Sequence, residues 1–154
     1  SYHHHHHVCT GTVDLNRLPR KIEQFHVDAN RFYGTVDLSA LPAPLTHLSL
    51  EKNDFHGTVD MLHLPPSLVE LFLDGNRFHG DVHLEALPVT MRLLHLHNGT
   101  FDGTVFLGML PDGLSDIKIG GNRFKGNVVL VGVSEDFSSD EFQKRSRAII
   151  DQVM

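Results

Sequence analysis

Residues 64–86 read LPPSLVELFLDGNRFHGDVHLEA, and this 23-residue pattern occurs five times without a gap. Each copy opens on a leucine-proline pair, and these pairs begin at Leu18, Leu41, Leu64, Leu87 and Leu110. A fixed period of about 20 to 50 residues is typical of a solenoid, in which every copy forms one coil and neighbouring coils bury each other's apolar faces. We therefore predict five stacked coils over residues 18–132.

The first half of each copy carries three apolar positions, spaced three and then two residues apart. They are Ile22, Phe25 and Val27, then Leu45, Leu48 and Leu50, then Leu68, Leu71 and Leu73, then Met91, Leu94 and Leu96, and finally Leu114, Ile117 and Ile119. The last two positions of each trio alternate with polar residues, which predicts a short strand with one buried face. The proline before each trio suits the turn that enters the strand, because it fixes φ and has no N–H to donate.

The second half of each copy follows the pattern NxFxG and ends in Val-x-Leu. Its asparagines are Asn30, Asn53, Asn76 and Asn122. An amide side chain both donates and accepts, so we expect each asparagine to satisfy backbone groups of its own coil and of the next. The phenylalanines Phe32, Phe55, Phe78, Phe101 and Phe124 should stack into an apolar column. The Val-x-Leu ending predicts a second strand on the opposite side of each coil.

Repeat four departs from this pattern, because Gly99 stands where the asparagine is due and Asn98 comes one place early. We expect one rung of the asparagine series to be affected there, with a local distortion of the coil.

The shared pattern LxxLxLxxNxFxG resembles the leucine-rich repeat family over residues 18–132. The NxFxGxV extension is similar to the plant-type and trypanosomatid surface-antigen subclasses, whereas bacterial effector repeats share the leucine-proline opening but lack the NxFxG half. The resemblance implies an α/β-class, strand-rich horseshoe. Such a solenoid has a parallel concave sheet and short convex-side strands, and we expect one C-terminal helix in addition.

The N-terminal residues divide into two parts. Residues 1–8 contain a run of five histidines, which we interpret as an affinity-tag remnant without order, the alternative being a native metal-binding tract. Residues 9–17 reproduce the second half of a coil, with Cys9 where phenylalanine would stand. The chain thus enters the pattern inside a repeat and without an evident cap. We expect either a piece of a longer protein or an open edge that pairs with another copy.

After the last repeat, residues 131–136 leave the pattern and a helix is expected within residues 133–154. Ser138 and Glu141 have the spacing of a capping box at its start. One face would carry Phe142, Ile149, Ile150 and Val153. The opposite face would point toward water and carry Lys144, Arg145, Arg147 and Asp151. We predict that this helix caps the last coil, the alternative being a linker to a further domain.

Composition excludes some functions and leaves the compartment open. The net charge of −6 disfavours nucleic-acid binding, and no apolar segment approaches the about 18 residues that a membrane span needs. The single cysteine, Cys9, slightly favours the cytoplasm. Against this, Asn98 begins an N-glycosylation acceptor triplet, and the surface-antigen resemblance implies the cell surface or secretion.

Side chains that alternate with the buried positions should line the concave face in three columns. The first column is Gln24, His47, Glu70, Leu93 and Asp116. The middle column is His26, Ser49, Phe72, His95 and Lys118. The third column is Asp28, Glu51, Asp74, His97 and Gly120. Parallel strands lie about 4.8 Å apart, so neighbours within a column are expected to touch.

Two features of these columns point to a binding surface. Asp28, Glu51 and Asp74 form a negative stripe, and Phe72 would stand exposed beside Leu93 as an aromatic anchor. The alternative interpretation is that the acids keep the face soluble and that neighbours cover Phe72.

A metal site is a weaker candidate on the same face. His95 and His97 lie two apart on one strand and share a face, and Asp74 would lie beside His97. Zn²⁺ favours histidine and carboxylate ligands, although solvent-exposed histidines are common without a metal.

The outward position of the second strand runs Asp14, Asp37, Asp60, His83, Phe106 and Val129. It therefore changes from acidic to apolar along the chain. We expect the terminal helix to fold over Phe106 and Val129, the alternative being a partner at this place.

We predict a protein-recognition module that binds a basic or mixed-charge protein on its concave sheet, without a cofactor and without catalysis. No nucleophile-base pairing is legible, and the glycines around Asn122 belong to a repeat bend, not to a phosphate loop. Two alternatives stay open, namely a structural segment that assembles through its N-terminal edge and a metal- or glycan-binding surface.

Overall fold

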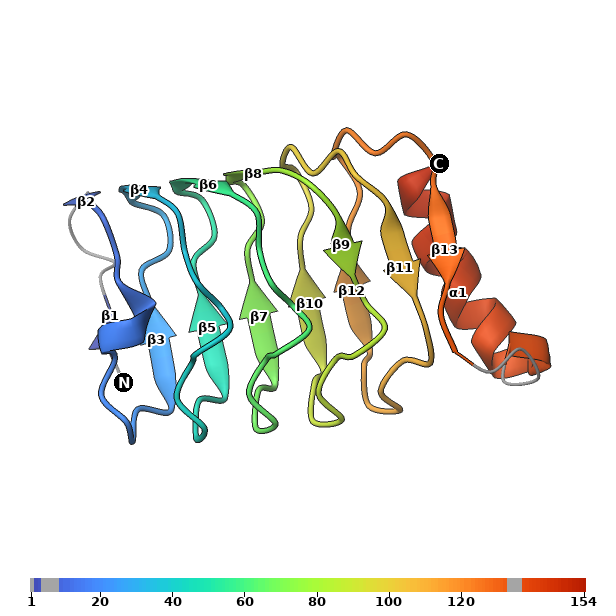
Figure 1. Ribbon diagram of the computed structural model, residues 1–154, viewed down its shortest axis with the longest axis horizontal. Helices are drawn as coiled ribbons and strands as arrows, with labels where there is room; N and C mark the ends of the chain where they lie inside the picture. The colour runs from blue at the N-terminus through green and yellow to red at the C-terminus, as the bar shows by residue number, and fades with distance from the viewer. Residues whose placement is uncertain (1, 4–8, 133–136) are drawn as a thin grey trace.

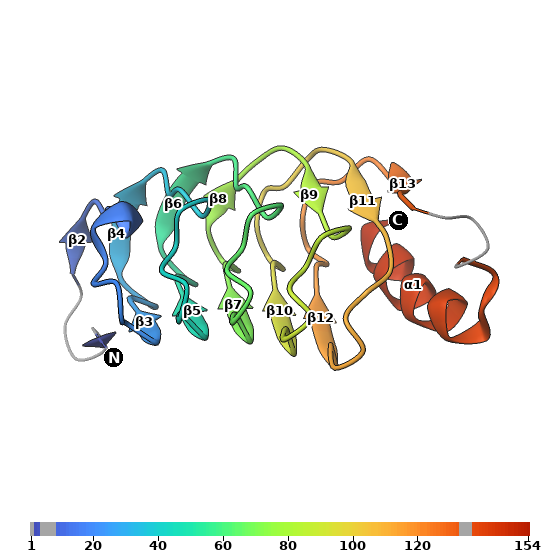
Figure 2. The same cartoon turned by 60° about the horizontal axis from the view of Figure 1, so that its bottom comes forward.

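The computed structural model describes residues 2–3, 9–132 and 137–154. The chain forms a strand-rich solenoid of parallel coils with one helix at its C-terminal end (Figure 1). One row of strands runs along one side of the solenoid and a second row along the opposite side (Figure 2). The 23-residue period therefore predicts the architecture correctly.

One long parallel sheet forms the first side, with the strand order β1-β3-β5-β7-β10-β12. Its strands are Tyr2–His3 (β1), Gln24–His26 (β3), His47–Ser49 (β5), Glu70–Phe72 (β7), Leu93–His95 (β10) and Asp116–Lys118 (β12). Leu48 pairs with Leu71 and Leu71 with Leu94, so equivalent residues of successive repeats lie side by side. The members of the predicted first column are therefore neighbours across this sheet, and so are the members of the middle column.

Two shorter parallel sheets form the opposite side. The first contains Thr10–Gly11 (β2), Arg31–Gly34 (β4), Asp54–Gly57 (β6) and Arg77–Phe78 (β8). The second contains Val82–His83 (β9), Val105–Leu107 (β11) and Val128–Leu130 (β13). The strand on this side thus falls on the NxFxG segment in the N-terminal coils and on Val-x-Leu only in the C-terminal coils, which corrects the prediction of one Val-x-Leu strand in every coil.

The residue at the outward position explains this change. In the N-terminal coils the carboxylate of Asp37 accepts the backbone N–H of Ser39, and that of Asp60 accepts the N–H of Leu62. Such local side-chain bonds compete with bonding between strands. In the C-terminal coils the backbone bonds across coils instead, as from the Leu84 N–H to the Phe106 carbonyl at 2.7 Å. The Val-x-Leu segment therefore becomes a strand only where aspartate is absent.

The core lies between the two sides and consists of the predicted leucines and phenylalanines. The rings of Phe55, Phe78, Phe101 and Phe124 stack in sequence, with centroids 6.4, 6.0 and 6.4 Å apart. The first three of these rings are almost fully buried. The apolar column predicted from the repeat is confirmed for these four rings, and the fifth predicted member, Phe32, is buried in the same core.

Asparagine side chains join neighbouring coils beneath this column. The Asn53 amide donates to the Leu50 carbonyl of its own coil and to the Val27 carbonyl of the preceding coil, and its oxygen accepts the Phe32 N–H at 3.1 Å. Asn76 repeats these bonds one coil further on. The asparagines thus connect each coil to the preceding one, and the prediction that they reach the next coil was wrong.

Repeat four keeps its backbone register despite the substitution at Gly99. Five residues have left-handed backbone at the place just before the asparagine position, namely Ala29, Lys52, Gly75, Asn98 and Gly121. Asn98 therefore fills the left-handed position of its coil, and Gly99 fills the position of the rung. Because glycine has no side chain, this rung is missing. Thr100, the next residue, donates its hydroxyl to the Phe78 carbonyl at 2.7 Å.

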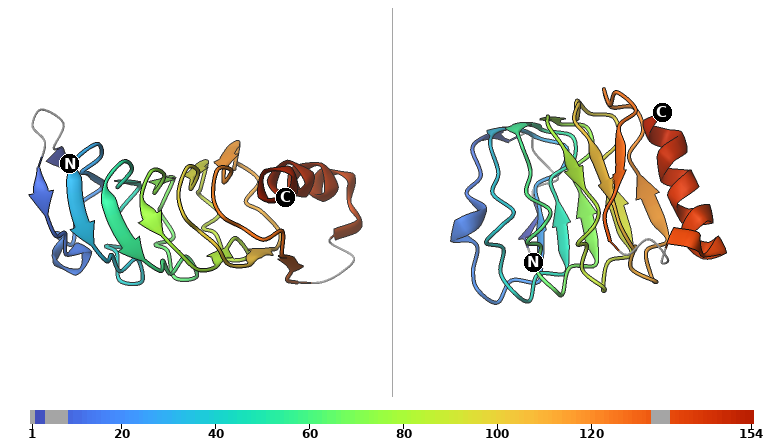
Figure 3. Two further views of the ribbon diagram at one scale, coloured as in Figure 1. Left: turned by 90° about the horizontal axis from the view of Figure 1, so that it is seen from above. Right: turned by 45° about the vertical axis from the view of Figure 1, so that its right-hand side comes forward.

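The helix Asp140–Val153 (α1) lies across the open end of the last coil (Figure 3). Phe142, Ile149 and Val153 are buried and belong to the same core as the coils. Arg145 donates to the carbonyls of Pro111 and Leu114, so it binds the last coil and does not simply face water as predicted. These contacts place the helix where a cap would be.

Two details of this end differ from the sequence-based expectations. The helix begins one residue later than predicted, because Ser139 and not Ser138 accepts the N–H of Phe142. The helix does not cover the outward strand positions, and Val129 remains 45% exposed. Phe106 is half-buried under a different neighbour, the ring of His83, which stacks on it at 4.5 Å. The predicted irregular segment 131–136 lies outside the described residues at positions 133–136.

The N-terminal half-coil follows the repeat as predicted. The N–H of Cys9 donates to the Asn30 oxygen at 2.8 Å, which is the bond that phenylalanine makes in later coils. The half-coil ends in a short 3-10 helix, Leu15–Arg17 (η1). Tyr2–His3 adds strand β1 outside β3, so this part of the expected tag remnant is ordered, and the rest of it lies outside the described residues. Within the described residues no helix has the length and the apolar character needed to cross a bilayer.

Candidate functional site

The candidate site is the solvent side of the six-stranded sheet, which we call the sheet face. It consists of the three predicted columns and the residues that directly follow the third column. The first two columns lie on the strands, and the third follows their carboxyl ends. Backbone bonds extend the parallel pairing past the strands, since the Lys52 N–H donates to the Asp74 carbonyl and the Gly75 N–H to the His97 carbonyl. All three columns therefore have a fixed spacing.

The sheet face is more enclosed than the periodicity predicts. Ser49 and Asp74 are buried, with 4% and 9% of their surface exposed, and Lys118 is exposed. The half-buried residues are Gln24, His26, Asp28, His47, Glu51, Glu70, Phe72, Leu93, His95, His97 and Asp116. Ser49 is the short member of its column between His26 and Phe72, which accounts for its burial. Phe72, expected to be exposed, is half-covered.

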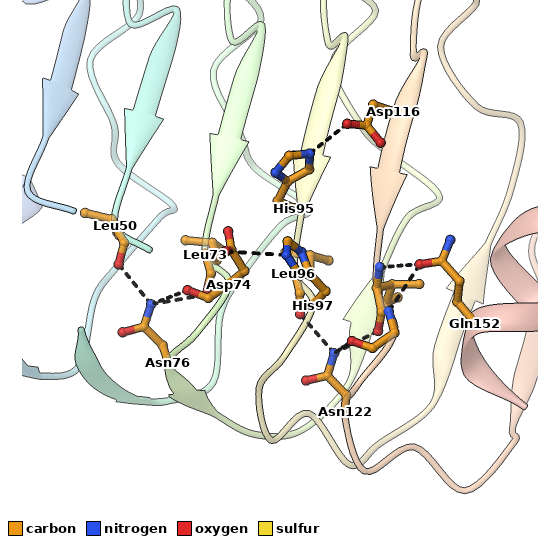
Figure 4. A network of polar contacts seen from close by, with 12 residues as sticks. Leu50, Leu73, Asp74, Asn76, His95, Leu96, His97, Asp116, Asn122 and Gln152 are labelled. Carbon is orange, nitrogen blue, oxygen red and sulfur yellow. Dashed lines mark hydrogen bonds and ion pairs between the residues drawn. The ribbon is translucent and has the colours of Figure 1, made fainter. Parts of the chain in front are cut away.

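Most histidines of the face contact a carboxylate of a neighbouring coil. His47 Nε2 lies 2.9 Å from Glu70 Oε2, and His95 Nε2 lies 2.9 Å from Asp116 Oδ2. His97 makes a looser contact, with its Nε2 3.6 Å from Asp74 Oδ2 (Figure 4). Two of the three pairs therefore have hydrogen-bonding distances, and the third does not.

Aromatic and imidazole rings cluster at the centre of the face. The rings of Phe72 and His95 have centroids 4.8 Å apart, and His95 meets His97 edge-on at 5.4 Å. The ring of Phe72 is therefore half-exposed and packs beside two imidazole rings. Phe72 is the residue that the sequence singles out as an anchor.

The acidic row Asp28, Glu51 and Asp74 has unusual electrostatics at its middle member. Burial first, and then the charges of Asp28 and Asp74, together raise the pKa of Glu51 to about 7. The Oε1 atom of Glu51 is buried and has no hydrogen-bond partner. Because a buried carboxylate oxygen without a partner is costly, a cation added beside Glu51 would stabilise its charged form.

A shallow depression of about 500 Å³ opens over this region. Its lining residues are Glu51, Lys52, Phe72, Asp74, Gly75, His95, His97, Asn98 and Lys118. The depression thus brings Glu51 and Asp74 of the acidic row together with Phe72 and the histidine pair. Sequence reasoning missed Lys52 and Gly75, although their position directly after the third column is the signal that could have found them.

The structure also brings together the three residues predicted as a metal candidate. One ligand atom from each of Asp74, His95 and His97 lies within 4.8 Å of the others. Burial lowers the pKa of His97, and the charges of His95 and Lys118 lower it further while that of Asp74 opposes the shift. The arrangement offers two imidazoles and one carboxylate to a ligand. Asn98, the predicted glycosylation residue, is exposed at the rim.

A scan of the sequence against protein-family models finds no match, and a search of curated proteins finds no relative. What the chain's own fold defines is a solenoid of parallel, strand-rich coils with a helix at its C-terminal end.

Proposed function

We propose that this chain is a protein-recognition module of the leucine-rich repeat type, which binds a basic protein segment on its sheet face. The observation that carries the proposal is the buried, unpartnered Oε1 of Glu51 between two further carboxylates. A lysine or arginine side chain from a partner would supply the missing donor. It would also neutralise part of the repulsion within the acidic row.

Three further features support recognition of a protein and not of a small molecule. The depression is shallow and continuous with a long sheet, whereas small-molecule sites are enclosed clefts that cover most of the ligand. Phe72 stands half-exposed beside the acidic row, where an aromatic side chain adds apolar contact area at little entropic cost. The face is built on paired strands, so its side chains have defined positions before binding.

Peptide selection tests the proposal without a known partner. A random peptide library is selected on the full chain, and synthetic copies of the selected peptides are titrated at low and high salt. We expect enrichment of lysine and arginine, and affinities that fall as salt is raised. Phe72→Ala is expected to weaken binding about tenfold, as for an anchor in the middle of an interface.

A charge-matched pair of variants assigns the surface. The row variant Asp28→Asn, Glu51→Gln, Asp74→Asn should weaken binding about tenfold or more. The control variant Glu23→Gln, Asp54→Asn, Asp112→Asn removes the same number of charges from exposed positions outside the row. It should leave only the general salt-dependent part of the affinity changed. Selected peptides that bind the row variant and the control variant equally well would overturn the proposal.

A further inference from the structure

We propose that Asp74, His95 and His97 form a site for a divalent transition-metal ion, with Zn²⁺ as the best chemical match. This inference does not depend on the proposed protein ligand. It rests on the positions of three side chains and on the second contact that holds His95.

The repeat places the three residues together for a simple geometric reason. His95 ends strand β10 and His97 follows it two residues later, so both side chains leave the same side of the sheet. Asp74 is the equivalent of His97 one coil earlier, and the Gly75 N–H bonds to the His97 carbonyl to keep the two coils in register. One carboxylate and two imidazoles are thereby presented to a single point.

The distance between Asp74 and His97 fits a bridging ion better than a direct bond. Asp74 Oδ2 and His97 Nε2 are 3.6 Å apart, which exceeds the usual N–H···O range. Two ligands on a tetrahedral zinc ion, with bonds of about 2.0 to 2.1 Å, are separated by roughly 3.3 Å. The pair is therefore close to the separation of two metal ligands. One ligand atom of His95 lies within 4.8 Å of a ligand atom of each of the other two residues, so His95 offers a third ligand at the same place.

A second contact orients His95, as is usual for metal-binding histidines. Its Nε2 lies 2.9 Å from Asp116 Oδ2, so Nδ1 is the nitrogen left for an ion. A carboxylate that holds the far nitrogen of a ligating imidazole fixes the ring and strengthens its basicity. Asp116 is thus a positioning residue in this proposal (Figure 4).

A second carboxylate lies beside the site and lines the same depression. Glu51 lies next to Asp74, and its Oε1 is buried without a hydrogen-bond partner. The cations Lys52 and Lys118 line the same depression but are exposed, so solvent screens them more than it screens the buried carboxylate of Asp74. The depression leaves room for water to complete the coordination.

Calorimetric titration with Zn²⁺ tests the site, provided that the N-terminal histidine run does not bind the ion. The full chain therefore carries serine at positions 3–7, and all further variants are made in this background. We expect one equivalent of Zn²⁺ to bind and to raise the unfolding temperature relative to the protein in EDTA. A background variant that shows no saturable Zn²⁺ binding overturns the proposal.

Single substitutions then assign the ligands. His97→Ala and the near-isosteric Asp74→Asn should each weaken Zn²⁺ binding by about tenfold or more. His47→Ala is the matched control, because His47 lies on the same face but is bonded to Glu70 one strand away. Asp116→Asn should weaken Zn²⁺ binding while the unfolding midpoint in EDTA stays unchanged, which a purely structural role would not produce. If His97→Ala and Asp74→Asn bind as tightly as His47→Ala, the ion sits elsewhere and the assignment fails.

Discussion

The N-terminal and C-terminal halves of this solenoid are built from one repeat and yet use two backbone arrangements on the side opposite the long sheet. Up to repeat three the strands lie on NxFxG, and aspartates at the outward position hold local turns. From Val82 onward the strands lie on Val-x-Leu and bond across coils. The buried positions of the repeat are the same in both halves, so one exposed residue per coil decides which segment becomes a strand.

The two sides of the N-terminal half make the same point about acids. Hydrogen bonds from Ser39 lower the pKa of Asp37, and bonds from His63 and Leu62 lower that of Asp60. On the sheet face, burial raises the pKa of Glu51 to about 7. The repeat places carboxylates at regular positions on both sides, and local hydrogen bonds stabilise Asp37 and Asp60 in the charged form. At Glu51 burial outweighs the hydrogen bond from its own backbone, and the buried Oε1 atom has no hydrogen-bond partner.

The largest expected effect concerns the asparagine side chains that join neighbouring coils in both halves. Asn76→Ala removes three donated hydrogen bonds and one accepted hydrogen bond, and it leaves buried backbone groups without a partner. We therefore expect a loss of about 3 to 5 kcal/mol in the free energy of unfolding. Asn98→Ala, one residue before the missing rung, removes an exposed side chain from a left-handed position and should cost at most about 1 kcal/mol. Urea denaturation followed by circular dichroism measures both. Equal losses would mean that Asn98 acts as a rung after all.

The next effect concerns the place where one arrangement gives way to the other. At Gly34, Gly57 and Gly80 an added Cβ would meet a threonine methyl of the preceding coil. At Gly103 it would meet backbone, with the Asp81 nitrogen and the Gly80 carbonyl carbon each 2.7 Å away.

Gly103→Ala therefore forces two coils apart, and we expect it to destabilise the protein by about 1 to 3 kcal/mol. Gly113→Ala, where a Cβ would meet nothing within 4 Å, is the control and should stay within about 0.5 kcal/mol of wild type. Thermal unfolding of the two variants side by side decides the matter. Similar unfolding midpoints would show that the backbone of repeat four can shift to accept the added methyl group, and that the close approach at Gly103 is not required for stability.

The repeat predicts those parts of the fold that depend on periodic burial. The strand register, the phenylalanine column and the three columns of the sheet face all follow from apolar spacing, because a parallel stack repeats every side chain at one height. The spacing also brings Asp74, His95 and His97 together, as the metal candidate requires. These predictions needed only the identity of the buried positions.

What the sequence did not predict depends on single polar contacts and on neighbouring side-chain size. The asparagines bond backward to the preceding coil because the Phe32 N–H is the donor within reach of Asn53, a choice that periodicity leaves open. The helix binds the end of the last coil through Arg145, which also looked suitable for water. The raised pKa of Glu51 comes from burial and from the charges of Asp28 and Asp74, whereas pattern alone assigned this side chain to solvent.

The smallest effect has the clearest sign and tests the contrast between the two sides directly. With a folded pKa of about 7 against an ordinary value of 4.5, Glu51 keeps a proton on folding that the unfolded chain releases, so stability falls as pH rises through this window. Glu51→Gln should therefore leave stability nearly unchanged near pH 4.5 but raise it at pH 8, by about 1 to 2 kcal/mol once solvent screening is allowed for. Urea denaturation in EDTA at both pH values measures the difference, with exposed Glu23→Gln as the control. If Glu51→Gln stabilises the protein equally at both pH values, the added stability comes from packing. The charged form of Glu51 would then not be destabilised in the acidic row, and a cationic ligand would gain nothing by pairing with it.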